Sequence, residues 1–112
     1  MKKISYLLSK KEFIERKIFA DLCDKTAICS GDEIIINCID GDLGTAKCLA
    51  VQEIEIHNRG LAILDGKPYG FGGVDSIVRV CGFRNSDEFK PNLPFKGFFV
   101  KFRRHQESEA QS

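Results

Sequence analysis

The chain has 112 residues, of which 43% are hydrophobic and 29% are charged. This length supports one core rather than two, and this composition excludes a disordered chain. The formal net charge is only +1, so any binding to nucleic acid must depend on a local patch of cations rather than on the charge of the whole molecule.

The sequence also argues against a membrane span, export and a disulfide framework. No apolar stretch approaches the length that crosses a bilayer. The apolar residues after Met1–Lys3 are too few for a signal peptide and are soon followed by charges, so we expect no export. Five cysteines without a CxxC pair argue against disulfides and a zinc site. We therefore expect a cytoplasmic protein with reduced thiols, no metal and no cofactor.

The first predicted elements are a strand and a helix. Lys2–Leu8 has enough Ile, Tyr and Leu for a strand. Ser9 and Glu12 then fit a capping box, and apolar residues at successive i,i+4 steps predict a helix over Lys10–Cys23. Asp24–Ser30 is the predicted connection to the next strand, where a side chain can reach a cleft without disturbing the core.

A hairpin at Gly31–Ile56 is the predicted centre of the fold. Asp32–Ile39 is an Ile-rich run bounded by turn residues, which is typical of a buried strand. The Asp-Gly within Asp40–Thr45 is a strong hairpin signal, and Ala46–Ile56 is the predicted second strand.

Beyond the hairpin, the pattern predicts shorter elements. His57–Gly60 is a predicted turn, and Leu61–Leu64 is a predicted short strand. Lys67–Gly73 contains one proline and three glycines and is predicted to be a mobile loop. Val74–Val80 fits either a strand or a helix. Asn85 and Glu88 have the spacing that starts a second, short helix.

The final predicted element is a strand over Phe95–Arg103. Phe98, Val100 and Phe102 should face one way, and the intervening residues should face the other way. Residues 104–112 are polar and predicted to be a flexible tail. We therefore expect a single domain over residues 1–103.

Few residues suggest nucleophilic catalysis. The two histidines are His57 in a predicted turn and His105 near the tail, with no recognisable nucleophile motif beside them. The basic residues around Phe95–Arg104 are interleaved with phenylalanines, which is typical of binding to a phosphate backbone. Equally, these phenylalanines could be core and the cations the wet face of an edge strand. Lys25 and Thr26 could likewise be a solvated loop pair.

Several segments together resemble a known family. A short strand, a helix ending near Lys25-Thr26, Gly31-Asp32 opening a strand, a turn and a second long strand are similar to the layout of ASCH domains. The segment Cys81–Phe89 (CGFRNSDEF) looks like the EGFxSxEEF segment of that family. An apolar closing strand, Gly97–Phe102, follows at the expected spacing. The resemblance covers residues 2–103.

The resemblance implies an α+β, PUA-like fold, which is a small β-barrel with one N-terminal helix and one or two short flanking helices. Its cleft suits RNA or modified nucleosides. Some ASCH proteins are amidohydrolases that remove the acetyl group from acetylcytidine, with a Lys, a Thr and a Glu in GxKTxTxR and EGF motifs. Lys25 and Thr26 match the KT, but the second Thr, the Arg and the Glu positions are Ile28, Ser30 and Cys81.

The resemblance therefore implies binding better than catalysis, since an amide hydrolase needs an acid or base beside its nucleophile. We expect a non-catalytic module that binds RNA or a modified nucleoside or nucleotide. Lys25, Thr26 and Cys81 should contact the ligand, and Arg84 and Arg16 should contact phosphate. The alternatives are a small amidohydrolase acting on acylated nucleosides, and a protein-interaction or viral accessory module with a protein partner.

Overall fold

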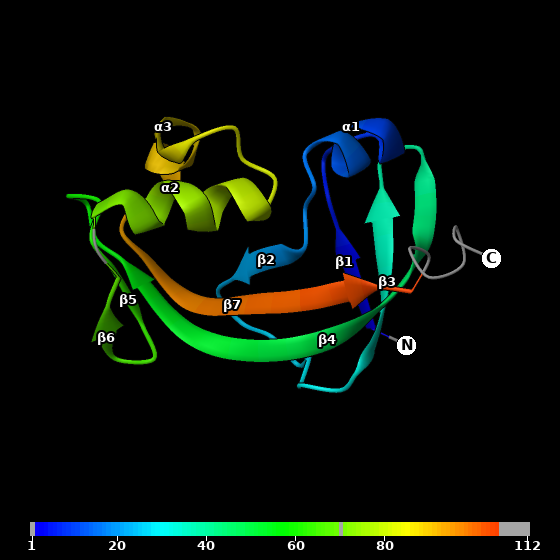
Figure 1. Ribbon diagram of the computed structural model, residues 1–112, viewed down its shortest axis with the longest axis horizontal. Helices are drawn as coiled ribbons and strands as arrows, with labels where there is room; N and C mark the ends of the chain where they lie inside the picture. The colour runs from blue at the N-terminus through cyan, green and yellow to red at the C-terminus, as the bar shows by residue number, and fades with distance from the viewer. Residues whose placement is uncertain (1, 70, 106–112) are drawn as a thin grey trace.

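Two long antiparallel strands, β4 (Gly41–Ile56) and β7 (Phe95–Arg104), run through the middle of the molecule (Figure 1). This computed structural model describes residues 2–69 and 71–105, without the side chains of residues 71 and 72. The other elements are β1 (Lys2–Ser5), α1 (Lys10–Glu15), β2 (Ala20–Cys23), β3 (Glu33–Cys38), β5 (Ala62–Leu64), β6 (Lys67–Pro68), α2 (Phe71–Val80), α3 (Ser86–Phe89) and the 3₁₀ turn η1 (Lys90–Asn92). The fold is α+β, as predicted, and is mostly sheet.

All seven strands of the described residues belong to one sheet. β7 pairs along one edge of β4, while β3 and β5 pair with opposite ends of its other edge. β1 is parallel to β3, and β2 is antiparallel to β7. The strip β1-β3-β4-β7-β2 curls round on itself, and the hydroxyl of Tyr6, just after β1, donates to the carbonyl of Ala20 in β2 at 2.6 Å. We call this end of the molecule the curled half.

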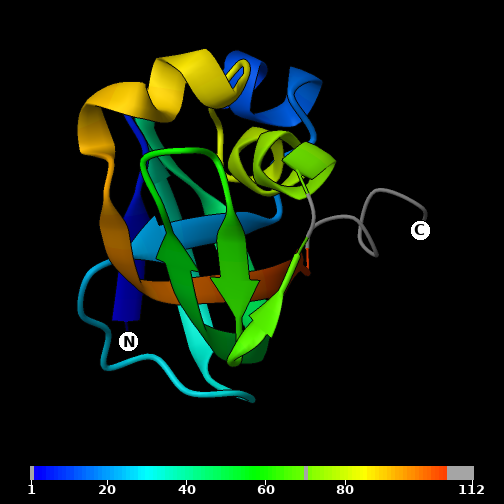
Figure 2. The same ribbon diagram turned by 90° about the vertical axis from the view of Figure 1, so that its left-hand side faces the viewer.

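The other end of the β4–β7 ribbon is covered by helices, and we call it the helix half. Figure 2 shows α2 and α3 above β5, β6 and the ribbon. Helix α2 is amphipathic, with Val74, Ile77 and Val78 buried at the spacing of one helix face. The segment 74–80, which the sequence fits to either a strand or a helix, is therefore helical.

A β-bulge in β4 separates the two halves. Cys48 pairs with Phe102, and Ala50 pairs with Lys101, so Leu49 is an extra residue without a partner across the ladder. Because side chains alternate along a strand, one extra residue reverses which face each later side chain occupies.

The two halves consequently bury opposite faces of the same ribbon. Ala46, and after the bulge Val51, lie against the core of the curled half, whereas Ile54 and Ile56 lie in the core of the helix half. We call the face toward the curled-half core the inner face, and the other one the outer face. The curled-half core comprises Ile4, Tyr6, Phe13, Ile18, Ile34, Ile36, Cys38, Ala46, Cys48, Val100 and Phe102. The helix-half core comprises Ala20, Ile54, Ile56, Ala62, Val74, Ile77, Val78, Cys81, Phe89 and Phe99.

The final strand follows the predicted alternation. Val100 and Phe102 lie in the curled-half core, while Phe99 lies in the helix-half core. The strand is thus buried on both faces near its middle, which is a stronger constraint than the single apolar face that alternation alone predicts. It continues to Arg104, one residue beyond the predicted end at Arg103. His105, also part of the predicted tail, donates its backbone N–H to the carbonyl of Thr45 at 3.1 Å. Residues 106–112 lie outside the described residues.

The first helix is much shorter than predicted. α1 ends at Glu15, Lys17 adopts a left-handed backbone with φ of 52°, and Ala20–Cys23 form β2 instead of completing a helix to Cys23. A short helix is marginal by itself, and pairing with β7 hydrogen-bonds one edge of these residues. Tertiary pairing therefore outweighs the helical periodicity of the apolar residues.

Both predicted helix caps are present. The Ser9 hydroxyl accepts from the backbone N–H of Glu12 at 3.1 Å, and the Asn85 side chain accepts from the backbone N–H of Glu88 at 3.1 Å. Each bond satisfies a donor that the helix itself leaves unpaired. The central hairpin and the short strand β5 also form as predicted.

Two connections differ from their predictions. The hairpin turn is tighter than Asp40–Thr45, because β4 resumes at Gly41, whose φ of 119° is accessible to glycine. The segment Lys67–Gly73 is not one loop, since β6 and the first residues of α2 lie within it. Gly70 and the side chain of Phe71 lie outside the described residues. In the part of the chain that the structure describes, no helix has the length and apolar character to cross a bilayer.

Candidate functional site

A pocket of about 360 Å³ opens where β1 and β2 face each other without pairing. It lies at the open seam of the curled half, and we call it the seam pocket. Its lining comes from β1, from β2 and from the loop that follows β2: Lys2, Lys3, Ile4, Ser5, Asp21, Cys23, Lys25, Thr26, Ala27 and Ile28. Lys25 and Thr26, two of the predicted site residues, therefore meet in one concave region.

The loop that carries Lys25 and Thr26 is fixed at several points. Lys2 donates from Nζ to the carboxylate of Asp32 at 2.6 Å and to the carbonyl of Ala27 at 2.5 Å. The Thr26 hydroxyl accepts from the backbone N–H of Ile28 at 3.0 Å. These contacts join the loop to β1, so the rim of the seam pocket is held at both ends.

Asp21 is the carboxyl group of the seam pocket. It lies opposite Val100 in the β2–β7 ladder and so shares the inner face of the curled half. Burial raises the pKa of Asp21 to about 6, against the opposing effect of a hydrogen bond from the Leu22 backbone. Among the residues that the structure describes, no ion pair involves Asp21. The group can therefore exchange a proton near neutral pH.

The neighbouring thiol is inert by comparison. Burial raises the pKa of Cys23 to about 11, Asp21 adds to the rise, and a hydrogen bond with Thr26 offsets part of it. All five cysteines are free. A neutral thiol beside Thr26 contributes to the shape of the pocket rather than to nucleophilic chemistry.

Three predicted site residues are not part of the seam pocket. Arg16 donates to the carbonyl of Gly82 at 2.6 Å and lies 3.3 Å from a carboxylate oxygen of Glu12. Cys81 is buried in the helix-half core, where burial raises the pKa of its thiol. Arg84 is exposed beside Glu88, which lies at 4.0 Å. The physical reason is β2, which carries the chain away from α1 before it reaches Lys25.

A second concave region lies between α1 and the end of β7, with a volume of about 580 Å³. Ile14, Lys17, Ile18, Phe19, Leu49, Phe102, Arg103 and Arg104 line it. This region, the basic groove, contains three cationic side chains and no carboxylate. It lies between the first helix and the sheet. Arg103 and Arg104 belong to the basic run that the sequence associates with a phosphate backbone, whereas none of the five predicted ligand contacts lines the groove.

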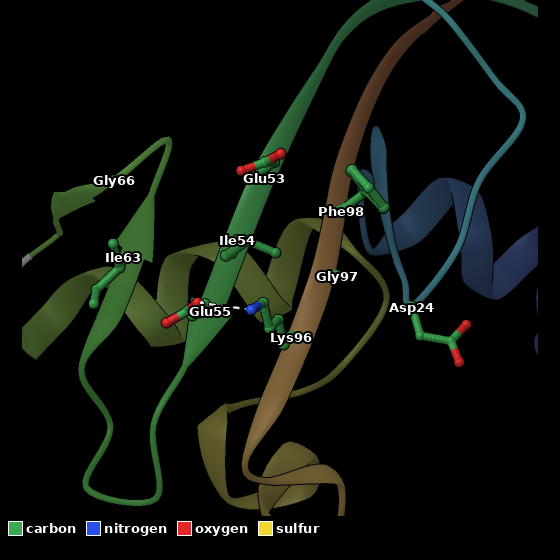
Figure 3. A pocket seen from close by; sticks show the side chains of 9 residues that line it. All are labelled: Asp24, Glu53, Ile54, Glu55, Ile63, Gly66, Lys96, Gly97 and Phe98. Atoms are coloured by element: carbon green, nitrogen blue, oxygen red, sulfur yellow. Dashed lines mark ion pairs between the residues drawn. The ribbon is translucent and has the colours of Figure 1, made fainter.

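A third concave region, of about 700 Å³, lies on the inner face of the helix half. Figure 3 shows Glu53 and Glu55 projecting from β4, with Asp24 across β7. Glu55 forms an ion pair with Lys96 at 3.6 Å, and Phe98 also lines the region. We call it the acidic pocket, because its carboxylates outnumber its single cation. It is a poor receptor for phosphate.

The described residues contain no group of three or more His, Cys, Asp or Glu side chains arranged to hold a metal ion. The chain matches no protein-family model, no curated protein and no solved structure at a significant level. The fold and the three concave regions are therefore the basis on which function can be argued.

Sequence reasoning missed Asp21 and Phe19 as site residues. Both lie in Lys10–Cys23, the segment that the spacing of apolar residues predicts to be a helix. The alternation of apolar and polar residues from Ala20 to Cys23 is a weak strand signal that would have placed Asp21 and Cys23 on one face. Phe19 and Arg103 are far apart in the sequence and line one groove only because of tertiary contacts. No local sequence pattern therefore indicates that they lie close together.

Proposed function

We propose that this protein is a PUA-like module that binds RNA or a nucleotide-sized ligand in the seam pocket, and that binding rather than catalysis is its activity. The observation that carries the proposal is the presence of Lys25 and Thr26 in one pocket at the mouth of a curled sheet. The order of the five curled strands and the helix α1 at the end of the barrel-like core support the PUA-like part of the proposal.

The chemistry of the lining suits a nucleotide. The Lys25 ammonium group can attract a phosphate, and the Thr26 hydroxyl can donate to a phosphate or sugar oxygen. The Asp21 carboxyl can accept a hydrogen bond from an amino group of a base when it is ionised. A phosphate at one side and an amino group at the other would thus each find a complementary partner.

The proposal leaves out the two arginines that the sequence predicts as phosphate contacts. Arg16 is engaged by Gly82 and Glu12, and Arg84 lies beside Glu88. Neither lines the seam pocket. Phosphate recognition there depends on lysine rather than arginine, so it supplies charge without a fixed bidentate geometry.

The test is calorimetric titration of cytidine monophosphate and cytidine into the wild type and Lys25→Ala at several salt concentrations. We expect Lys25→Ala to weaken binding of the monophosphate by roughly 10- to 150-fold, since a charge-assisted hydrogen bond contributes roughly 1.5–3 kcal/mol. Cytidine should be affected less, because it lacks the phosphate. Lys90→Ala, an exposed lysine on η1, is the control that removes equal charge.

Two results would contradict the proposal. One is monophosphate affinity that changes neither with salt nor with Lys25→Ala. The other is turnover of acetylcytidine followed by chromatography in the same samples, which would favour the amidohydrolase interpretation instead.

A further inference from the structure

We propose that the basic groove is a second, separate site that binds the backbone of single-stranded nucleic acid, with Phe19 as a surface for a stacked base. The groove shares no lining residue with the seam pocket. The inference therefore stands whether or not the seam pocket binds a nucleotide.

The charge of the groove is the first observation. Lys17, Arg103 and Arg104 line it, and Lys47 lies directly opposite Arg103 in the β4–β7 ladder. No ion pair within the described residues involves any of these four cations. Three such charges in the groove, with Lys47 beside Arg103, attract a polyanion even though the whole chain is nearly neutral.

The acids near the groove contact other side chains. Glu12 lies 3.3 Å from Arg16, and Glu15 lies 4.0 Å from Lys11. Glu33, which lies opposite Lys47 in the β3–β4 ladder, is 2.7 Å from a ring nitrogen of His105. No carboxylate lines the groove itself, so Lys17, Arg103 and Arg104 remain available to an external anion.

The exposed apolar side chains are the second observation. Ile14, Phe19 and Leu49 are 51%, 45% and 54% exposed, although all three line the groove. Leu49 is the bulged residue of β4, and bulges commonly redirect a side chain at a binding site. A half-exposed aromatic ring among cations is the arrangement on which a base stacks while its phosphates bind nearby.

Arg104 adds a cation held against the core. Its guanidinium carbon lies 5.9 Å from the ring centroid of Phe13, which is fully buried at the end of the curled half. This contact orients Arg104 without neutralising it. A positioned guanidinium can bind phosphate through two parallel hydrogen bonds.

Single-stranded nucleic acid fits these features better than the other polyanions that would be attracted. An acidic peptide offers carboxylates but no regular π face for the Phe19 ring, whereas every nucleobase offers one. An anionic membrane calls for a protruding apolar surface, but here the apolar side chains line a hollow. Duplex nucleic acid keeps its bases stacked and unavailable.

The test is fluorescence anisotropy with labelled oligouridine across a salt series. We expect Arg103→Ala to weaken binding and to reduce the slope of log affinity against log salt by about 0.7, because the variant neutralises one phosphate fewer. Phe19→Ala should weaken binding by roughly 5- to 100-fold, as stacking on an aromatic side chain is worth about 1–3 kcal/mol per base. Lys96→Ala, in the acidic pocket, should change affinity by less than about twofold.

The outcomes separate this site from the seam pocket. Lys25→Ala should leave oligouridine binding to the groove largely intact, and Arg103→Ala should leave cytidine monophosphate binding intact. The inference is overturned if oligouridine does not bind, if Arg103→Ala and Lys96→Ala behave alike, or if polyglutamate or anionic vesicles compete as well as unlabelled oligouridine at equal ionic strength. Thermal unfolding of each variant verifies that it is folded.

Discussion

The curled half and the helix half use the same two strands in opposite ways. In the curled half the inner face of the β4–β7 ribbon is core, and the outer face carries Lys47, Leu49 and Arg103. In the helix half the outer face is core, and the inner face carries Glu53 and Glu55. One ribbon therefore presents a basic surface at one end and an acidic surface at the other, and a net charge of +1 conceals both.

The bulge at Leu49 therefore determines the arrangement of charge on the surface as well as the burial of the two cores. In a regular ladder that paired every residue of β4, Lys47 and Glu53 would occupy the same face, because they lie an even number of positions apart. With the bulge, their side chains lie on opposite faces, and each charge is exposed where the opposite face is buried. The separation of charge is thus a consequence of strand register.

The largest expected effect comes from inserting one alanine between Lys101 and Phe102 of β7, which gives Leu49 a partner and removes the bulge. With a regular ladder continued from the curled half, Glu53 and Glu55 would point toward α2, and Ile54 and Ile56 would leave the helix-half core. Burying carboxylates without partners costs several kcal/mol each, which is comparable with the total stability of about 5–15 kcal/mol for a small domain. We expect loss of cooperative unfolding, measured by circular dichroism.

The control for the insertion is Leu49→Ala, which keeps the bulge. Leu49 is 54% exposed, so we expect this change to cost less than about 1 kcal/mol. An insertion variant that unfolds cooperatively near the wild-type temperature would show that the bulge is not required to bury the two cores.

A smaller loss of stability is expected from truncating either of two phenylalanines on the inner face of β7. Phe102 is 2% exposed in the curled-half core, whereas Phe98 lines the acidic pocket and is half-buried. Phe102→Ala should lower the free energy of unfolding by about 3–5 kcal/mol. Phe98→Ala should lower it by only about 1 kcal/mol. Urea denaturation measures both, and equal losses would mean that the inner face is buried along its whole length.

Much of the fold could be predicted because its signals are local. The Ile-rich run of β3, the caps at Ser9 and Asn85 and the alternation of β7 each depend on neighbouring residues in the chain. β2 and the bulge could not be predicted, since Ala20–Cys23 becomes a strand only when β7 is beside it. The extra residue at Leu49 is likewise visible only in the pairing with the opposite strand.

The candidate site likewise has residues that the sequence could predict and residues that it could not. Lys25 and Thr26 are adjacent in the chain, so a short motif was enough to bring them to one pocket. Arg84 was assigned to that pocket from the order of the elements, which says nothing about distance across the sheet. The basic groove joins Lys17 from one end of the chain to Arg103 from the other, and no pattern in the sequence links them.

The smallest expected effect is a pH dependence of stability that arises from Asp21. Asp21 lies on the inner face of the curled half, and Glu53, an acid on the inner face of the helix half, serves for comparison. Burial raises the pKa of Asp21 to about 6 from an ordinary value of 3.8, so the folded state binds its proton more tightly than the unfolded state does. The stability that this proton contributes is fully present below pH 3.8 and is lost as the pH rises through about 6.

Relative to the wild type, Asp21→Asn should therefore gain on the order of 2 kcal/mol in free energy of unfolding as the pH rises from about 4 to about 7. Taking the difference between variant and wild type at each pH cancels the contributions of the other carboxylates. Glu53→Gln, on the exposed part of the same face, should show a difference that stays within about 0.5 kcal/mol over this range. If both variants respond to pH alike, Asp21 is not shielded from solvent, and the inner face of the curled half is as open at the seam as it is in the acidic pocket.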